Sequence, residues 1–137
     1  MSLLAGASSD DLETVRDKFF PCIEYTYITR PETGMVMVRA KADGSKARFN
    51  LGEVIVSRCV LEVGKTHMGV AWILGSDLRH AELAALFDGL LQNPDFHEKL
   101  KVPLLEKLRA KQSAKNRDVA KNVAGTMVEF FTLKRGE

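Results

Sequence analysis

Three apolar runs in the middle of this 137-residue chain constrain its fold more than any other feature. They occupy residues 35–38, 54–56 and 70–74, in a stretch that is rich in β-branched and aromatic residues. Because neighbouring side chains of a strand point to opposite faces, an unbroken apolar run places apolar groups on both faces of a sheet. An antiparallel sheet with one face in water would alternate polar and apolar residues instead. The runs therefore predict a sheet that needs cover on both sides.

Turn residues separate these runs and predict the number of strands. The breaks fall at residues 31–34, 43–45 and 64–65, and each contains a glycine. We expect a four-stranded antiparallel meander with strands at residues 22–29, 35–41, 49–63 and 66–74. Gly52 is expected to form a bulge in the long third strand.

Helical patterns lie on both sides of the strand region. Capping residues at positions 8–11 predict a short N-terminal helix that ends before Pro21, and residues 1–7 look like the tail of another helix. After Ser76, apolar residues recur at three- and four-residue spacing, which predicts a second helix that ends at Asn93.

The C-terminal third predicts a long helix. Pro103 is expected to occupy the first position of this helix, which would run to about Gly125. The apolar residues 128–133 are expected to dock as a strand or an extended arm.

Together these elements give an α+β fold, which we expect to form a single domain over residues 1–137. The predicted helices can cover one face of the sheet well and the other only in part. Burial of apolar area is worth about 25 cal/mol per Å², so the uncovered face favours association with another chain. The alternative is that the N-terminal and C-terminal helices pack on opposite faces and close the core within one chain.

The composition is that of an ordinary globular protein, with 45% hydrophobic and 28% charged residues. A formal net charge of +2 is too small to indicate a nucleic-acid-binding protein by itself. No segment approaches the ~20 apolar residues of a membrane span and the N-terminus lacks a secretory signal pattern, so we expect a cytoplasmic protein. Cys22 and Cys59 lie in apolar surroundings and are expected to be reduced core residues.

The strongest candidate site lies where the last apolar run meets the following helix. Ser76 or Asp77 can cap this helix, which leaves Arg79, His80 and Glu82 on its first turns. A helix N-terminus beside an arginine favours a bound anion or an interface. The alternative is an ordinary solvated helix start, in which Arg79 pairs with Glu82.

Two charged residues interrupt the apolar third strand. Glu53 and Arg58 need partners inside a strand, so we expect them to pair across the sheet, with Arg39 or Arg48 as candidate partners, or to line a cleft.

The absence of several known motifs argues against some classes of protein. His67, His80 and His97 show no metal-ligand spacing, so we predict no metal site. The chain has no Walker loop, no GxGxxG fingerprint and no GxSxG elbow, so independent nucleotide hydrolysis lacks its usual machinery. A basic stripe on the last helix is typical of a solvated face, and the absence of aromatic residues beside it argues against nucleic acid. The stripe contains Lys107, Arg109, Lys111, Lys115, Arg117 and Lys121.

Four blocks of the chain carry a family resemblance. They are residues 30–39 (RPETGMVMVR), residues 49–54 (FNLGEV) with Arg58 and Cys59, residues 74–82 (LGSDLRHAE) and residues 129–136 (EFFTLKRG). In order and spacing these blocks resemble the PhnG family, whose members are subunits of the bacterial carbon–phosphorus lyase system. The resemblance spans nearly the whole chain, and residues 94–124 are its least diagnostic part.

The resemblance implies a multi-subunit assembly with PhnI, PhnH and PhnJ, helped by the ATPase PhnL. This assembly forms α-D-ribose 1-methylphosphonate 5-triphosphate from ATP and a phosphonate under phosphate starvation. The nucleosidase chemistry is credited to PhnI, and SAM and the iron–sulfur cluster belong to PhnJ. The resemblance therefore implies an accessory subunit that binds no cofactor of its own.

Two other functions remain open from the sequence. The first is a co-catalytic role, in which Arg58, Arg79, His80 and Glu82 reach a shared interface and contact the triphosphate or the phosphonate. The second is a stand-alone module that binds an anion or nucleic acid and has no catalytic role. A homodimer is an alternative state of the isolated chain.

Overall fold

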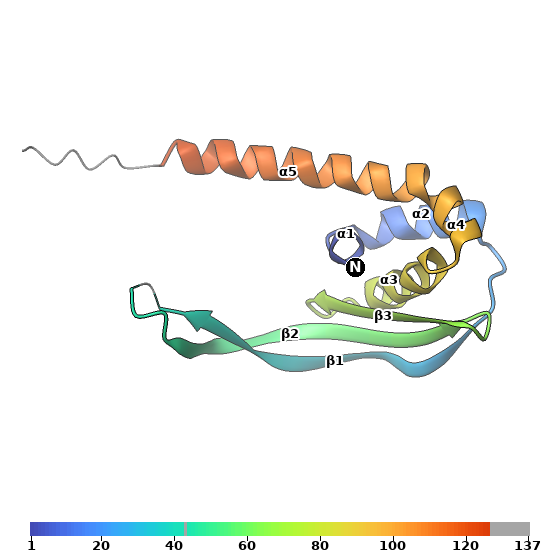
Figure 1. Ribbon diagram of the computed structural model, residues 1–137, viewed down its shortest axis with the longest axis horizontal. Helices are drawn as coiled ribbons and strands as arrows, with labels where there is room; N and C mark the ends of the chain where they lie inside the picture. Colours follow the sequence, from blue (N-terminus) through green and yellow to red (C-terminus); the bar gives the residue numbers. More distant parts are fainter. Residues whose placement is uncertain (43, 127–137) are drawn as a thin grey trace, which may run out of the picture.

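A helical layer packs on one face of an antiparallel sheet (Figure 1) in the computed structural model, which describes residues 1–42 and 44–126. The sheet has three strands in the order β1-β2-β3. This arrangement confirms the predicted α+β class, and the alternative with helices on opposite faces is wrong. In chain order the elements are α1 (Ser2–Ala5), α2 (Ser9–Phe19), β1 (Tyr25–Lys41), β2 (Arg48–Val63), β3 (His67–Leu74), α3 (Leu78–Leu91), α4 (Pro94–Leu100), the π-helix η1 (Lys101–Glu106) and α5 (Lys107–Ala124).

The prediction of four strands is wrong, because the first two predicted strands are one continuous strand, β1. The break expected at residues 31–34 is a local irregularity, in which the register shifts between Thr29, opposite Val60, and Glu32, opposite Arg58. β1 lies at the edge of the sheet. An edge strand tolerates Pro31, since the missing N–H of proline need not cost a ladder hydrogen bond there.

The other predicted features of the sheet are confirmed. Val38 pairs with Gly52 and Arg39 pairs with Asn50, so β2 carries an extra residue at the expected bulge. The turn between β2 and β3 contains Gly64 and Lys65, which both have positive φ, as a tight hairpin turn requires.

The core lies between the sheet and α3. Side chains from the helix-facing side of β2 and β3 pack against α3, which is apolar on nearly all sides because α1, α2 and α4 surround it. Fully buried members of this core include Leu12, Cys59, Leu61, Ala71, Leu83, Leu86, Phe87 and Leu90. Cys22, by contrast, is exposed, so the prediction of two core cysteines is right for Cys59 and wrong for Cys22.

The C-terminal helical region begins earlier than predicted. α4 starts at Pro94 with Asn93 as its N-cap, and the predicted start at Pro103 lies inside η1. The wider π-helical turn lets the chain pass through this proline without a break. α5 ends at Ala124, close to the predicted end, whereas the predicted strand at residues 128–133 lies outside the described residues. No helix in the described part of the chain is both long and apolar enough to cross a membrane.

One face of the sheet is left without cover by the described residues. Strand alternation places Arg58, Val60, Trp72 and Leu74 on the face away from the helices, which we call the open face. Leu74 is 76% exposed and Trp72 is 49% exposed. The predicted apolar character of both faces is therefore confirmed, and the residues that the structure describes cover only one face.

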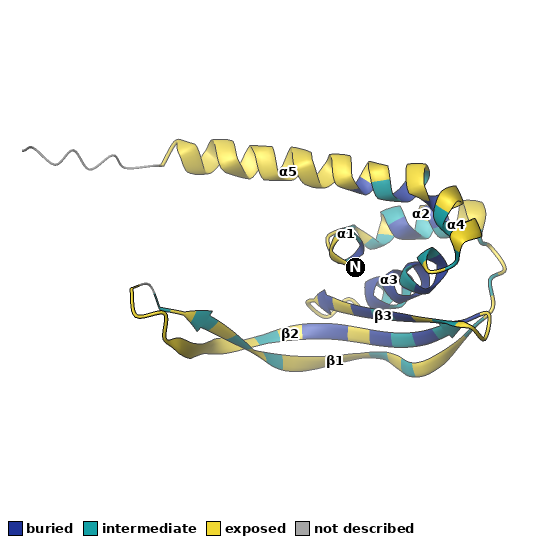
Figure 2. Ribbon diagram, in the orientation of Figure 1, coloured by how far each residue is buried: buried dark blue, intermediate teal, exposed yellow. Residues whose placement is uncertain are grey.

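Two elements extend beyond the core in the same direction (Figure 1). β2 pairs with β3 only from Val56 onward, so residues 35–41 and 48–55 form a two-stranded ribbon, which we call the arm. The second element is residues 109–124 of α5, which we call the α5 extension. All its residues are exposed, whereas Leu108 is buried (Figure 2).

Candidate functional site

The junction between β3 and α3 is fixed by a small set of hydrogen bonds. Gly75 has a φ of +100°, and its N–H donates to the carbonyl of Ile55 at 2.9 Å. The hydroxyl of Ser57 donates to the carbonyl of Gly75 at 2.8 Å. Asp77 caps α3 by accepting a hydrogen bond from the N–H of His80 at 2.9 Å. A carboxylate therefore already occupies the positive pole of this helix.

Glu82 is the centre of a hydrogen-bonded network beneath β1. Its Oε1 accepts hydrogen bonds from the hydroxyl groups of Tyr25, at 2.5 Å, and of Tyr27. Its Oε2 accepts a hydrogen bond from Nη1 of Arg79 at 2.8 Å. Arg79 also donates from Nη2 to Oε1 of Glu13 at 2.9 Å. This Glu82 network joins the edge strand β1 to α3 and α2.

The pKa shifts within the network favour a structural role. Burial raises the pKa of Glu82, but the hydrogen bonds from both tyrosines and Arg79 outweigh burial and hold it below its ordinary value of 4.5. Burial and the hydrogen bond to Glu82 raise the pKa of Tyr25 and of Tyr27. The hydrogen bond to Glu13 is the main cause that raises the pKa of Arg79. These groups are thus moved away from the near-neutral pKa that a general acid or base needs.

His80 points away from this network. It is buried, and its Nε2 lies 2.8 Å from the carbonyl oxygen of Leu4, so it joins α3 to α1. The structure therefore brings Arg79 and Glu82 together and separates His80 from them. Within residues 1–42 and 44–126, no group of three or more histidine, cysteine, aspartate or glutamate side chains is arranged to hold a metal ion.

Arg58 lies on the open face, on the opposite side of the sheet from the Glu82 network. Its Nε donates to Oε1 of Glu32 at 2.5 Å, and its guanidinium lies 5.6 Å from the ring centroid of Trp72. Arg58 therefore pairs with Glu32, and not with Arg39 or Arg48, the candidate partners named from the sequence. Arg58, Glu32 and Trp72 border a shallow groove whose other lining residues include Gly34, Val36 and Val56.

Glu53 belongs neither to the Glu82 network nor to the group formed by Arg58, Glu32 and Trp72. It lies opposite Met37 in the arm, and it makes no ion pair with any residue that the structure describes. The cross-sheet pairing expected for Glu53 is therefore not observed.

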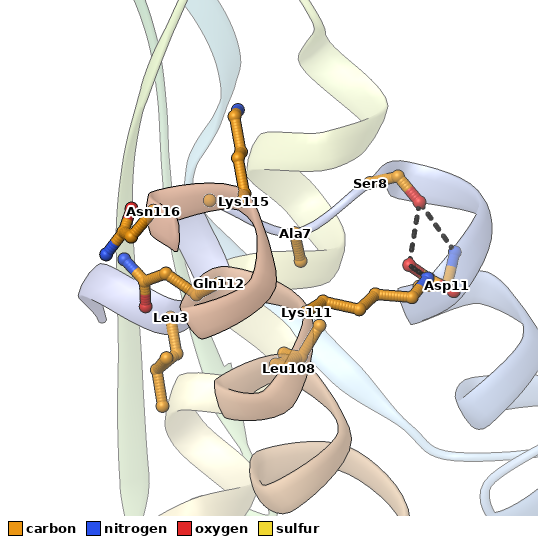
Figure 3. Close-up of a pocket in the computed structure, with 10 residues that line it drawn as sticks. Leu3, Ala7, Ser8, Asp11, Leu108, Lys111, Gln112, Lys115 and Asn116 are labelled. Atoms are coloured by element: carbon orange, nitrogen blue, oxygen red, sulfur yellow. Dashed lines mark hydrogen bonds and ion pairs between the residues drawn. The ribbon is translucent and has the colours of Figure 1, made fainter. Parts of the chain in front are cut away.

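A hollow of about 380 Å³ lies between the start of α2 and α5 (Figure 3). Asp11 lies at its edge and accepts a hydrogen bond from Lys111, while Nζ of Lys107 is 3.8 Å from the same carboxylate. The hydrogen bond from Lys111 is the main cause that lowers the pKa of Asp11. Asp11 thus anchors the first turns of α5 to α2, and Lys111 is already paired.

The contacts of Glu82 and of Asp11 are hard to predict from the sequence. Tyr25 and Tyr27 lie 57 and 55 residues before Glu82, and Asp11 lies 100 residues before Lys111. One local pattern does point to the network, since two tyrosines at alternate positions of a strand share a face. That pattern can predict a pair of phenol groups but not the carboxylate between them.

Comparison with known proteins extends over all the elements described above. Residues 1–136 match the family model described as "Phosphonate metabolism protein PhnG". The chain is also 39% identical over 137 residues to the alpha-D-ribose 1-methylphosphonate 5-triphosphate synthase subunit PhnG of Rhizobium meliloti. That alignment covers 100% of this chain and 87% of the relative.

Proposed function

This chain belongs to the PhnG family of phosphonate metabolism proteins, and we propose that it is an accessory subunit of a ribose 1-methylphosphonate 5-triphosphate synthase. The synthase would use ATP and a phosphonate as substrates. Its other subunits would be PhnI, PhnH and PhnJ, with PhnL as a functional partner, and the assembly would be cytoplasmic. The support for this proposal is the similarity to a relative that is named as a subunit of such a synthase.

The observation that carries the proposal is the open face of the sheet. Met68, Trp72 and Leu74 are exposed there, and the guanidinium of Arg58 lies 5.6 Å from the ring centroid of Trp72. Aromatic residues, methionine and arginine are the side chains that are enriched in protein interfaces. Water contact with this face costs about 25 cal/mol for each Å² of apolar area, which a neighbouring subunit would recover. We therefore place another subunit of the synthase on the open face.

The accessory role follows from the internal bonds of the candidate residues. Arg79 and Glu82 satisfy each other and the side chains of Glu13, Tyr25 and Tyr27, as described above. His80 is buried against Leu4. Of the four residues considered for a co-catalytic role, only Arg58 is exposed, and Glu32 pairs with it. These residues hold the subunit in shape, and PhnI would supply the chemistry.

Co-expression tests the proposal. The chain would be co-expressed with PhnI, PhnH and PhnJ, and the complex isolated by size-exclusion chromatography. We expect the wild-type chain to co-elute with these subunits and the Leu74→Glu variant to elute separately. Thr14→Glu is the matched control, because it adds the same charge at an exposed position of α2, and it should co-elute. Separate elution of the wild-type chain would overturn the proposal.

A second variant separates the accessory role from a co-catalytic one. Arg58→Ala removes the one exposed residue among the four considered for a co-catalytic role, and we expect complexes that contain it to retain their turnover of ATP and phosphonate. Loss of turnover in a fully assembled Arg58→Ala complex would show that this guanidinium acts in the chemistry.

A further inference from the structure

The positive charge of the chain is concentrated in its two projecting elements. The α5 extension contains five lysine and arginine residues, of which Lys111 is paired with Asp11, and one acidic residue, Asp118. Residues 39–48, at the end of the arm, contain four basic residues and one acidic residue. The whole chain has a net charge of only +2, so the rest of the molecule is net negative. Both projections therefore favour a negatively charged partner.

The α5 extension also carries two exposed valines on the side of α5 that packs on the core. Val119 and Val123 follow Leu108 by three and four helical turns, so they lie on the same side of α5. Leu108 is buried against the core, whereas Val119 is 53% exposed and Val123 is 60% exposed. The hollow of Figure 3 follows this side of the helix, where Gln112 and Asn116 line it. The side of α5 that packs on the core thus continues, uncovered, along the extension.

The arm presents an apolar surface on the same side of the sheet as the helices. Ile55 alternates with the buried residues Ser57 and Cys59 along β2, so it belongs to the helix-facing side. Met35 lies opposite Ile55, and Met37, which is itself opposite the acidic Glu53, follows on the same side. All three side chains are about half exposed or more. A two-stranded ribbon is marginally stable in water, so this arm needs a contact that the described residues do not supply.

The two projections are similar in length. The 16 residues of the α5 extension span about 24 Å as a helix, and the eight residues 48–55 span about 27 Å as a strand. Both leave the body in the same direction (Figure 1). Val119 and Val123 continue the core-packing side of α5, and Met35, Met37 and Ile55 continue the helix-facing side of the sheet, so the two sets of exposed apolar residues are on facing sides. We call the pair the jaw.

We infer that the jaw grips one segment of a partner subunit, an amphipathic segment with apolar residues at its centre and acidic residues at its flanks. The inference rests on the proposed function and adds the chemistry of the contact. Valine and methionine side chains suit the apolar side of such a segment, while Lys115, Arg117 and Lys121 suit its acidic flanks. α5 has no aromatic residue on which a base could stack, which disfavours nucleic acid. A second copy that placed α5 against α5 would oppose like charges.

A charge-reversal experiment tests the electrostatic part. The assembled PhnI–PhnH–PhnJ subunits would be bound by labelled wild-type chain, and unlabelled variants would compete for binding. We expect Lys115→Glu with Lys121→Glu to weaken competition about tenfold or more, because two favourable charges become repulsive. Lys65→Glu with Lys99→Glu is the matched control, since it makes the same change in net charge away from the jaw, and it should compete within about twofold of wild type.

A second comparison tests whether the α5 extension and the arm bind the same segment of the partner. Val119→Ser with Val123→Ser, and Met35→Ser with Met37→Ser, change only exposed positions, so circular dichroism should show folded chains. Each pair of substitutions should weaken competition. The variant with all four substitutions should weaken it by less than the product of the two fold-changes, because the effects of groups that share one contact are not additive. A full product would mean two independent contacts and would overturn the single-segment inference.

The outcomes separate this inference from the proposed function. If wild-type chain fails to bind the other subunits, the proposed function is wrong. If wild-type chain binds and the jaw variants compete equally well, only the inference is wrong. Two other outcomes would also contradict the inference, both with a charge-reversal variant that still enters the complex. In the first, the variant loses the binding to a single-stranded RNA oligonucleotide that the wild-type chain shows. In the second, the variant loses a homodimer that analytical ultracentrifugation shows for the wild-type chain.

Discussion

Gly69 of β3 and Gly89 of α3 lie backbone against backbone at the centre of the core. A Cβ atom on Gly69 would lie 1.9 Å from the carbonyl oxygen of Ala85 and 2.8 Å from the nitrogen of Gly89. A Cβ atom on Gly89 would lie 3.3 Å from the nitrogen of Gly69. Real Cβ contacts are never as short as the first of these distances, so the spacing of strand and helix depends on Gly69.

We predict that Gly69→Ala destabilises the chain by about 3 kcal/mol or more, because neither backbone can move without disturbing the core on both sides. Urea unfolding followed by circular dichroism would measure the loss. Gly34→Ala is the matched control, since its Cβ atom would meet nothing within 4 Å, and it should change stability by less than about 0.5 kcal/mol. Equal losses for the two variants would contradict the close approach.

A second prediction concerns the Glu82 network. Glu82→Gln removes the charge that accepts three side-chain hydrogen bonds, and we expect a loss of about 1.5–3 kcal/mol in the free energy of unfolding. Glu32→Gln removes the charge from an exposed ion pair and should cost less than about 1 kcal/mol. If urea unfolding shows equal losses of stability for Glu32→Gln and Glu82→Gln, the Glu82 network stabilises the fold no more than the exposed ion pair does.

The same network predicts a pH dependence. The pKa of Glu82 lies below its ordinary value of 4.5 in the folded chain, so folding favours its ionised form. Its stabilising effect is complete above the ordinary pKa and is lost as the pH falls through the lower folded pKa. The stability gap between wild type and Glu82→Gln should therefore be constant above pH 4.5 and should narrow below it. A gap that widens on acidification would contradict this sign.

The two cysteines should differ in reactivity. Burial is the main cause that raises the pKa of the Cys59 thiol to about 11, whereas Cys22 is exposed. Brief treatment of the folded chain with iodoacetamide at pH 8 should modify Cys22 alone, as mass spectrometry would show. The Cys22→Ser variant should stay unmodified until urea unfolds it. Rapid modification of that variant in native buffer would show that Cys59 is accessible.

The anchor of α5 can be weakened at one residue. Asp11→Asn removes the charge that holds Lys107 and Lys111, and we expect faster hydrogen exchange in the first turns of α5, with a stability loss of about 1 kcal/mol. Asp10→Asn removes a charge from the same helix turn without touching these lysines, so it controls for the helix dipole. Unchanged exchange in α5 of Asp11→Asn would mean that Leu108 alone holds the helix.

Local patterns in the sequence predicted the elements whose features are themselves local. The capping residues before α2 and the apolar spacing of α3 identified both helices, and Asp77 was one of the two residues expected to cap α3. Pro31 and Pro103 misled the prediction because each sits where the surrounding structure tolerates it. Pro31 lies in an edge strand, and Pro103 lies in a π-helical turn.

The candidate site was predictable only in part. Arg79 and Glu82 were identified as a pair, because residues three apart on a helix are neighbours. Tyr25, Tyr27 and Glu13 were missed, since the pairing of β1 and the packing of α2 bring them there from distant parts of the chain. His80 was assigned to the same group because the sequence does not show which way a side chain on the first turn of a helix points.

The arm has a consequence for the amounts of protein in the cell. The described residues supply no third strand to this ribbon, a ribbon of two strands opens easily, and segments that open easily are the ones that proteases cut. Copies synthesised in excess of the other subunits would be degraded first, while assembled copies would be protected. The stoichiometry of the synthase could then be balanced by turnover of the surplus chain, without a dedicated regulator.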